Sequence, residues 1–269
     1  MDKNKAAFKL KGLPPVYYLN LDAEPERDAY MKAQLKYWEI EDYTRISAYD
    51  GRGDRDLGSI LKGRYPDGMS SSEVGCTTSH LKILKHFLDN SDAPCALVIE
   101  DDCDLGTAFH WPFTWKDFFC KIPYDYDVVQ LAIINPASIT LQLHRRFVND
   151  FSTAAYLITR HHAEKLVRLH CRGGYTGEQT YKLDNGCKPR AVADDLIYNS
   201  GNTFAIPLFL YRLELGSSIH TEHLDAFHRS SYEGLWNFWR QDAANIQDWN
   251  VIFDYDPYAG RLPPGFEGK

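Results

Sequence analysis

The strongest chemical signal in the sequence is a group of carboxylates that directly follows an apolar segment. Residues 95–100 read CALVIE, and Glu100 is followed by Asp101, Asp102 and Asp104. A continuous apolar run of this length predicts a strand that is buried on both faces of a sheet. The carboxylates at its end repel one another, and a hard divalent cation such as Mg²⁺ or Mn²⁺ would relieve that repulsion. A solvated acidic turn is the alternative interpretation.

A second acidic feature is the pair Asp194 and Asp195, which Ala-Val-Ala precedes and Leu-Ile-Tyr follows. Adjacent side chains on a helix point in different directions, so one carboxylate could face a cleft while the other faces solvent. A carboxylate beside a bound substrate could act as a general base for a hydroxyl group. Aspartate is equally favoured as a capping residue at the start of a helix, so both roles stay open.

Three histidines, His220, His223 and His228, form a further group of potential ligands. His220 and His223 are three residues apart and could share one face of a helix. No cysteine lies at a matching short spacing, so the pattern does not predict a zinc site. One of the three, with His220 as first candidate, could instead complete an oxygen-rich metal site.

The elements that must position these residues follow from the apolar pattern. A capping box formed by Ser70 and Glu73 predicts the start of one helix, and strands alternate with helices in the first half, which indicates βαβ units and a largely parallel sheet. Open α/β sheets bind ligands at the carboxyl ends of their strands, where the first acidic group falls. The expected strands are 15–21, 95–100, 126–134, 153–159 and 203–211, and the expected helices are 24–39, 70–90, 161–170 and 193–198. An aromatic C-terminal extension follows, in which we expect Trp236 and Trp239 to dock onto the core.

Several classes of function are excluded by composition and by missing motifs. The 269 residues carry a net charge of −7, which argues against non-specific binding of nucleic acid. The sequence contains no GxGxxG, GxxxxGK[ST] or GxSxG pattern, so dinucleotide oxidoreductases, P-loop hydrolases and α/β-hydrolases are not predicted. No apolar run approaches the roughly 20 residues that span a bilayer. We also expect no secretory signal in residues 1–14, because they lack an apolar stretch.

The cysteines bear on the cellular compartment. Six are spread along the chain without a CxxC pair. This pattern is typical of reduced, mostly buried thiols, and it predicts a cytoplasmic location.

Blocks of sequence between about residues 15 and 220 resemble, in order, glycosyltransferase family 25, which includes lipooligosaccharide and collagen hydroxylysine galactosyltransferases. The first block contains Asn20 and Arg27, and a later one contains Ser79 and His80. The blocks read YYLNLDAEPERDAYM, AYDG, SSSEVGCTTSHLKIL, CALVIEDDCDL, TAAYLITRHHAEKLV, VADDLIY and AIPLFLYRLELGSSI. The sequence departs from the family pattern at residues 24–26, in the loop 52–70 and beyond about residue 225.

The resemblance implies a GT-A type α/β fold, with a mixed, mostly parallel sheet flanked by helices. It implies a domain at residues 15–225, between an N-terminal extension (1–14) and a C-terminal extension (226–269) that packs on it. It further implies a UDP-sugar donor, most often UDP-galactose, and Mn²⁺ or Mg²⁺. The sugar would pass, with inversion at the anomeric carbon, to a hydroxyl of a glycan or of a protein hydroxylysine.

The resemblance also suggests roles for single residues. Asp102, with Asp104 and His220, would hold the metal. Asp194, which aligns with the family aspartate better than Asp195, would be the general base. The residues expected near the donor are Asn20, Arg27, Ser79, His80, Glu100 and Asp101. Arg27 could instead be a surface cation of its helix, and Ser79 and His80 could serve packing alone.

Three other functions fit parts of this pattern. A catalytically silent module could bind a glycan or a partner in the same cleft, using exposed aromatic residues. A glycoside hydrolase also needs two carboxylates, but it needs neither metal nor nucleotide. A nucleotidyltransferase would use the acidic group in the same way and would release pyrophosphate.

Overall fold

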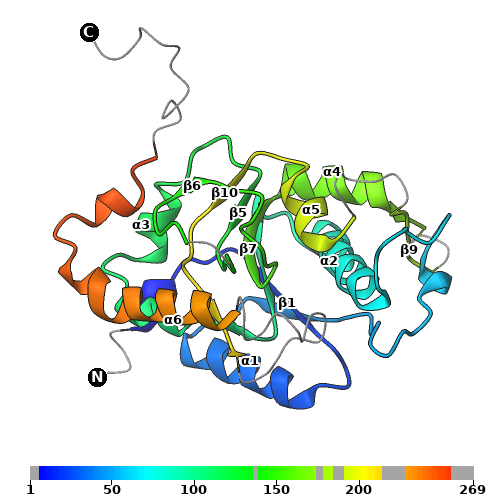
Figure 1. Ribbon diagram of the computed structural model, residues 1–269, viewed down its shortest axis with the longest axis horizontal. Helices are drawn as coiled ribbons and strands as arrows, with labels where there is room; N and C mark the ends of the chain where they lie inside the picture. The colour runs from blue at the N-terminus through cyan, green and yellow to red at the C-terminus, as the bar shows by residue number, and fades with distance from the viewer. Residues whose placement is uncertain (1–5, 136–138, 174–177, 184–190, 214–227, 256–269) are drawn as a thin grey trace, which may run out of the picture.

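The structure, a computed structural model, describes residues 6–135, 139–173, 178–183, 191–213 and 228–255 (Figure 1). Its centre is a seven-stranded sheet with the strand order β2-β1-β3-β7-β5-β10-β6. Five of these strands run in one direction, while β7 and β6 run in the other. The expected α/β architecture with a mixed, mostly parallel sheet is therefore confirmed. The strands are β1 (Val16–Asn20), β2 (Tyr43–Ser47), β3 (Cys95–Glu100), β5 (Val128–Gln130), β6 (His144–Arg145), β7 (Ala155–Thr159) and β10 (Thr203–Ala205).

Helices cover both faces of the sheet (Figure 1). On one face α2, α4 and α5 pack against alternate side chains of β1 and β3, such as Tyr17 and Val98. On the other face α1, α3 and the C-terminal segment enclose the intervening side chains, such as Tyr18 and Leu97. The helices are α1 (Pro25–Tyr37), α2 (Ser71–Asn90), α3 (Trp115–Phe119), α4 (Arg160–His170), α5 (Ala193–Tyr198) and α6 (Arg229–Asn237). None of the helices in these described ranges has the length and apolarity needed to cross a bilayer.

Two small antiparallel ladders and several short helical turns complete the fold. The ladders pair β4 (Cys103–Asp104) with β11 (Leu210–Tyr211), and β8 (Cys171–Arg172) with β9 (Thr180–Tyr181). The 3₁₀ turns are Ala7–Leu10, Gly58–Ile60, Gly106–His110, Ala243–Asn245 and Trp249–Ile252, and a π-helical turn spans Phe238–Asp242.

The capping box expected at the start of α2 is confirmed. The Glu73 backbone N–H donates to Ser70 Oγ at 3.2 Å, and the Ser70 N–H donates to Glu73 Oε2 at 2.8 Å. These two bonds satisfy donors that the first turn of a helix otherwise leaves free. They fix where α2 begins, and hence which of its side chains face the sheet.

Two expectations about the elements were wrong. Residues 203–211 form two strands, because Pro207 lies between them and has no N–H for a sheet ladder. Only Val128–Gln130 of the expected strand 126–134 lies in the sheet. The edge strand β2 was not predicted. Only Ile46 in it is buried, so its sequence lacks the alternation of apolar residues that indicates a strand.

The aromatic C-terminal segment is attached to the core through Trp239. This side chain is 1% exposed, lies against Trp111 and Phe113, and donates from Nε1 to the carbonyl oxygen of Pro207 at 2.9 Å. Trp236, three residues earlier, is only partly buried and stacks on Tyr232. Docking onto the core is thus confirmed for Trp239, while the domain boundaries themselves stay a prediction.

Truncating these two tryptophans should therefore have unequal effects on stability. Trp239→Ala should lower the free energy of unfolding by about 3–5 kcal/mol, because it leaves a large cavity and an unpaired carbonyl group. Trp236→Ala removes a partly exposed ring and should cost much less. Urea denaturation of the two variants measures the difference. Equal losses would show that Trp239 is not what attaches this segment to the core.

Candidate active site

The candidate site is a pocket of about 210 Å³ at the carboxyl ends of β1 and β3. In the register of these parallel strands Leu19 lies beside Glu100, so the residues that follow them meet at one edge of the sheet. The loop 48–52 after β2 and the starts of α1 and α2 form the other walls. His80, the sixth residue expected near a donor, is 1% exposed and does not line the pocket. The walls gather the other five residues expected near a donor, namely Asn20, Arg27, Ser79, Glu100 and Asp101.

Arg27 supplies positive charge to the first two aspartates of the acidic group. It donates from Nε to Asp101 Oδ1 at 2.6 Å and from Nη2 to Asp102 Oδ2 at 3.0 Å. Asn20 Nδ2 donates to the second oxygen of Asp101 at 2.8 Å. Because α1 begins only a few residues after β1, its first turn brings Arg27 to the end of β3. Arg27 is therefore not a surface cation of its helix, as one interpretation of the sequence had it.

Asp102 keeps one oxygen without a partner. Among the described residues no donor reaches Oδ1, which is buried. Burial, together with the negative charges of Glu100 and Asp101, raises the pKa of Asp102 to about 7, against the opposing charge of Arg27. A buried, unpaired carboxylate oxygen is costly, and it is a suitable ligand atom for Mg²⁺ or Mn²⁺. The donor chemistry at this point therefore fits a hard divalent cation.

Asp104 has a backbone hydrogen bond of its own. It lies in β4, one residue beyond a buried cysteine, and its Oδ1 accepts a hydrogen bond from the Gly106 backbone N–H at 2.7 Å. That bond fixes the turn into the 3₁₀ helix Gly106–His110. This bond gives Oδ1 of Asp104 a local structural role.

Glu100 belongs to a hydrogen-bond network that connects β3 with α2 and β7. Thr153 Oγ1 donates to Glu100 Oε1 at 2.7 Å, and His80 Nε2 lies 3.3 Å from the same oxygen. The other ring nitrogen of His80, Nδ1, lies 3.0 Å from the Tyr156 hydroxyl. Burial acts to raise the pKa of Glu100, but the hydrogen-bond and electrostatic effects of His80, the hydrogen bond from Thr153 and the charge of Arg27 together hold the pKa below its usual value.

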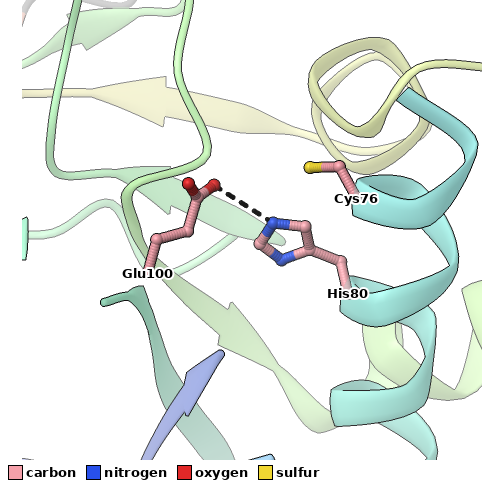
Figure 2. Close-up of side chains that lie close together, drawn as sticks. All are labelled: Cys76, His80 and Glu100. Carbon is pink, nitrogen blue, oxygen red and sulfur yellow. Dashed lines mark hydrogen bonds and ion pairs between the residues drawn. The ribbon is translucent and has the colours of Figure 1, made fainter. Parts of the chain in front are cut away.

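Cys76 faces the same carboxylate from one turn earlier on α2 (Figure 2). The ligand atoms of Cys76, His80 and Glu100 lie within 4.8 Å of one another. Burial, with the nearby charge of Glu100, raises the pKa of the Cys76 thiol well above its usual value. Cys76 was not among the site residues predicted from the sequence, although its spacing of four from His80 places both on one face of a helix.

Asp194 and Asp195 diverge in the way that their adjacency predicts. Asp194 Oδ1 accepts a hydrogen bond from the Ser152 backbone N–H at 2.7 Å. Asp195 is 8% exposed and accepts from Asn199 Nδ2, one turn later on α5, at 3.1 Å. Asp194 therefore faces the start of β7, whereas Asp195 is used within its own helix. Neither side chain caps α5, for which no side-chain cap is present.

The surroundings of Asp194 raise the pKa of its carboxyl group. Burial raises its pKa to about 6, although the charge of Arg146 and the hydrogen bond from Ser152 act in the opposite direction. Ser152 has a φ of 100°, in the region that favours glycine. Its carbonyl oxygen accepts from Tyr198 Oη at 2.9 Å and from Gln130 Nε2 at 3.0 Å, and these bonds help to maintain the strained backbone.

Of the three histidines considered as ligands, the structure describes only His228. His220 and His223 lie outside the described residues, so the place of His220 in a metal site stays a prediction. His228 precedes α6, where its carbonyl oxygen accepts a hydrogen bond from Tyr211 Oη at 2.7 Å. Its backbone thus serves to position α6 on the ladder of β4 and β11.

Comparison with known proteins gives one family. The profile of "Glycosyltransferase family 25 (LPS biosynthesis protein)" matches residues 13–176, which is more than half of the chain. No curated protein sequence matches the chain significantly. A solved structure, "Crystal Structure of A197 from STIV", is similar at a TM-score of 0.36 and 10% identity, over 72% of this chain and 82% of that chain. We draw no conclusion about fold or function from a likeness at that TM-score.

Removing Arg27 should expose the repulsion that it relieves. Breaking a buried ion pair from one side costs about 3–5 kcal/mol, and Arg27 keeps 15% of its side chain exposed, so we expect Arg27→Gln to fall at or below the lower end of that range. The loss should be larger at pH 8 than at pH 5, because Asp102, with a pKa of about 7, is largely neutral at the lower pH.

Urea denaturation of the metal-free protein at the two pH values measures this effect. Arg64→Gln is the matched control, since the Arg64–Asp67 pair is 76% and 75% exposed and should contribute little. A loss for Arg27→Gln that matches the control, or one that does not depend on pH, would contradict this account of the acidic group.

Proposed function

Because the chain belongs to glycosyltransferase family 25, we propose that it transfers a hexose from a UDP-sugar to an acceptor hydroxyl, with inversion at the anomeric carbon. Galactose is the first candidate and glucose the next. The observation that carries the proposal is the pocket itself, which gathers Asn20, Arg27 and Asp101 at the carboxyl ends of two parallel strands. Ligands of open α/β sheets bind at this edge.

The donor would bind in this pocket. Nucleotide and diphosphate carry hydrogen-bonding groups and negative charge, which suit a wall made of Arg27, Asn20 and backbone groups of the loop 48–52. Tyr49, on the same wall, offers an aromatic face. Arg27 is already bound to two aspartates, so we propose that it orients them and adds positive charge beside the diphosphate.

Asp102 is the residue that would hold a divalent cation, through the oxygen that no donor among the described residues reaches. When bound, Mn²⁺ or Mg²⁺ would neutralise the charge that grows on the departing diphosphate. Arg27 would keep Asp102 in place from its other oxygen. Asp104 and His220 stay as proposed further ligands, although the hydrogen bond from Gly106 already occupies one oxygen of Asp104.

Asp194 is the proposed general base. Inversion requires a single in-line attack by the acceptor hydroxyl and one group that accepts its proton. A carboxylate with a pKa of about 6 is ionised at neutral pH and is a better base than an ordinary aspartate. The bond from Ser152 would orient Asp194. Asp195 is the alternative base, although it already accepts a hydrogen bond from Asn199.

The remaining parts of the proposal concern the context of the reaction. We propose a GT-A type fold for residues 15–225 with extensions on both sides, and a glycan or a protein hydroxylysine as acceptor. The family description favours a lipopolysaccharide-type glycan. We also propose a cytoplasmic location, which the five described cysteines support because all carry free thiols.

A donor screen tests the function. UDP-, GDP- and CMP-sugars are incubated with Mn²⁺ or with EDTA, and nucleotide release is measured with and without glycan acceptors. The proposal predicts release of UDP that depends on the metal. Binding of saccharide without consumption of any donor would favour the silent binding module instead. Release of pyrophosphate would indicate a nucleotidyltransferase, and chelator-resistant cleavage of a simple glycoside would indicate a hydrolase.

Asp102→Asn should separate the metal from the rest of the site. The change removes the proposed ligand charge but keeps the side-chain shape, and we expect kcat with Mn²⁺ to fall about 10²–10³-fold. Asp92→Asn, an exposed aspartate outside the pocket, is the control and should be unchanged. Unaltered metal dependence in Asp102→Asn would remove Asp102 from the metal site.

The pH profile tests the base. A general base must be deprotonated to act, so kcat/KM should fall as pH drops through about 6, the pKa of Asp194. Asp194→Asn should reduce kcat about 10²–10⁴-fold and abolish this acid limb. Asp195→Asn is the discriminating variant. If it removes the limb while Asp194→Asn keeps it, the base is Asp195.

A further inference from the structure

Cys76, His80 and Glu100 form a group of three potential metal ligands next to the proposed donor pocket (Figure 2). Cys76 and His80 are four residues apart on α2 and project from the same face of the helix, and Glu100 reaches them from the end of β3. Their ligand atoms lie within 4.8 Å of one another. Among the described residues, no other three His, Cys, Asp or Glu side chains bring their ligand atoms within this distance of one another.

The distances suit a small tetrahedral ion. Zinc bonds of about 2.0–2.3 Å place neighbouring ligand atoms of a tetrahedron about 3.3–3.6 Å apart. His80 Nε2 and Glu100 Oε1 are already 3.3 Å apart. Because the ligand atoms lie within 4.8 Å of one another, a shift of at most roughly 1.5 Å in the Cys76 side chain would complete three corners of the tetrahedron. The fourth corner can be reached from the pocket, because Cys76 and Glu100 both line it.

The donor set identifies the class of ion. A thiolate, an imidazole and a carboxylate together suit Zn²⁺, a borderline-soft ion, whereas Mg²⁺ and Mn²⁺ prefer oxygen ligands alone. Asp102 offers only oxygen and lies beside Arg27. The two places at this edge of the sheet therefore select different ions.

Nucleophilic catalysis by Cys76 is the competing role for the same three residues. A nucleophilic cysteine needs a histidine nitrogen that is free to take its proton. Both ring nitrogens of His80 already have partners, since Nε2 faces Glu100 and Nδ1 faces Tyr156 Oη. A triad would have to displace Glu100 from Nε2 and leave that carboxylate without this bond, whereas a metal ion would bind Glu100 as well as His80.

The same contacts suit a metal ligand. A histidine that binds zinc usually donates its second ring N–H to a neighbouring oxygen. Tyr156 Oη can accept a hydrogen bond from Nδ1 or donate one to it, so His80 can change tautomer without losing this partner. Nε2 would then present its lone pair to the ion, and Glu100 would exchange its bond with His80 for a bond to the metal.

We propose that Cys76, His80 and Glu100 bind Zn²⁺ in a three-ligand site whose open position faces the pocket. On binding, the Cys76 thiol loses its proton to solvent and forms an S–Zn bond, while His80 and Glu100 each give one lone pair. A water molecule, or an anionic oxygen of a ligand in the pocket, takes the fourth position. This site is separate from the metal proposed at Asp102, and it does not depend on the transferase activity.

Cobalt substitution tests the site without any sugar nucleotide. Co²⁺ is added to the metal-free, reduced full-length protein, and the near-ultraviolet thiolate-to-cobalt charge-transfer band is recorded. We expect the wild-type protein to show this band at one equivalent and to lose it when one equivalent of Zn²⁺ is added. An excess of Mg²⁺ should not remove it. Absence of the band from the wild-type protein would overturn the proposal.

Variants assign the ligands. Cys76→Ser and Cys76→Ala should lose the band, whereas Cys120→Ser, which removes an exposed cysteine, should keep it. Tyr156→Phe should weaken Co²⁺ binding about 10–100-fold, the usual effect of losing the partner of a ligating histidine. A band that persists in both Cys76 variants would place the metal elsewhere and refute the site.

Two further measurements keep these results interpretable. Circular dichroism of the metal-free variants shows whether they are folded, and either Cys76 variant suffices if the other is not. Zn²⁺ should raise the melting temperature of the wild-type and Cys120→Ser proteins but not that of a folded Cys76 variant. Asp102→Asn should retain both the band and the shift. If the band appears and no UDP-sugar is consumed, the zinc site stands and only the proposed transferase function fails.

Discussion

The site depends on how the fold accommodates the carboxylates at the end of β3. Their mutual repulsion must be relieved where a buried strand meets the surface. Arg27 neutralises Asp101 and one side of Asp102, while Thr153 and His80 provide hydrogen bonds to Glu100. No donor in the described part of the chain reaches the second oxygen of Asp102. The described residues thus satisfy most of the group and leave one carboxylate oxygen whose chemistry suits a hard cation.

The strand directions decide which residues can take part. Because β1 and β3 are parallel neighbours, the residues after both strands lie at one edge. β7 runs antiparallel to β3, with Ala155 beside Ile99, so it begins at the edge where β3 ends. The residues just before β7 therefore meet both acidic features: Thr153 contacts Glu100, and Ser152 contacts Asp194. The residues that lead into the antiparallel strand β7 thus contact both acidic segments, the one at residues 100–104 and the one at residues 194–195.

Sequence patterns predicted what local periodicity and caps control. The buried strand CALVIE with its acidic end and the capped start of α2 follow from such signals, whereas the expectation that Asn20 lies in the site rested on the family resemblance. The pairing of Arg27 with the acidic group could not be predicted, because it depends on how closely α1 approaches β3. The φ of Ser152 was hidden for a similar reason, since it is imposed by partners that are distant in the sequence.

Cys76 shows why residue type alone is a weak guide to chemistry. In the sequence it is one of six scattered cysteines without a partner motif, and burial keeps its thiol protonated. Its spacing from His80 becomes informative only when β3 brings Glu100 to the same face of α2. Glu100 and Asp102 are only two residues apart, yet they belong to different donor sets. Glu100 lies with a sulfur and a nitrogen donor, whereas Asp102 offers only oxygen. Neighbouring carboxylates of one short segment can in this way favour chemically different cations.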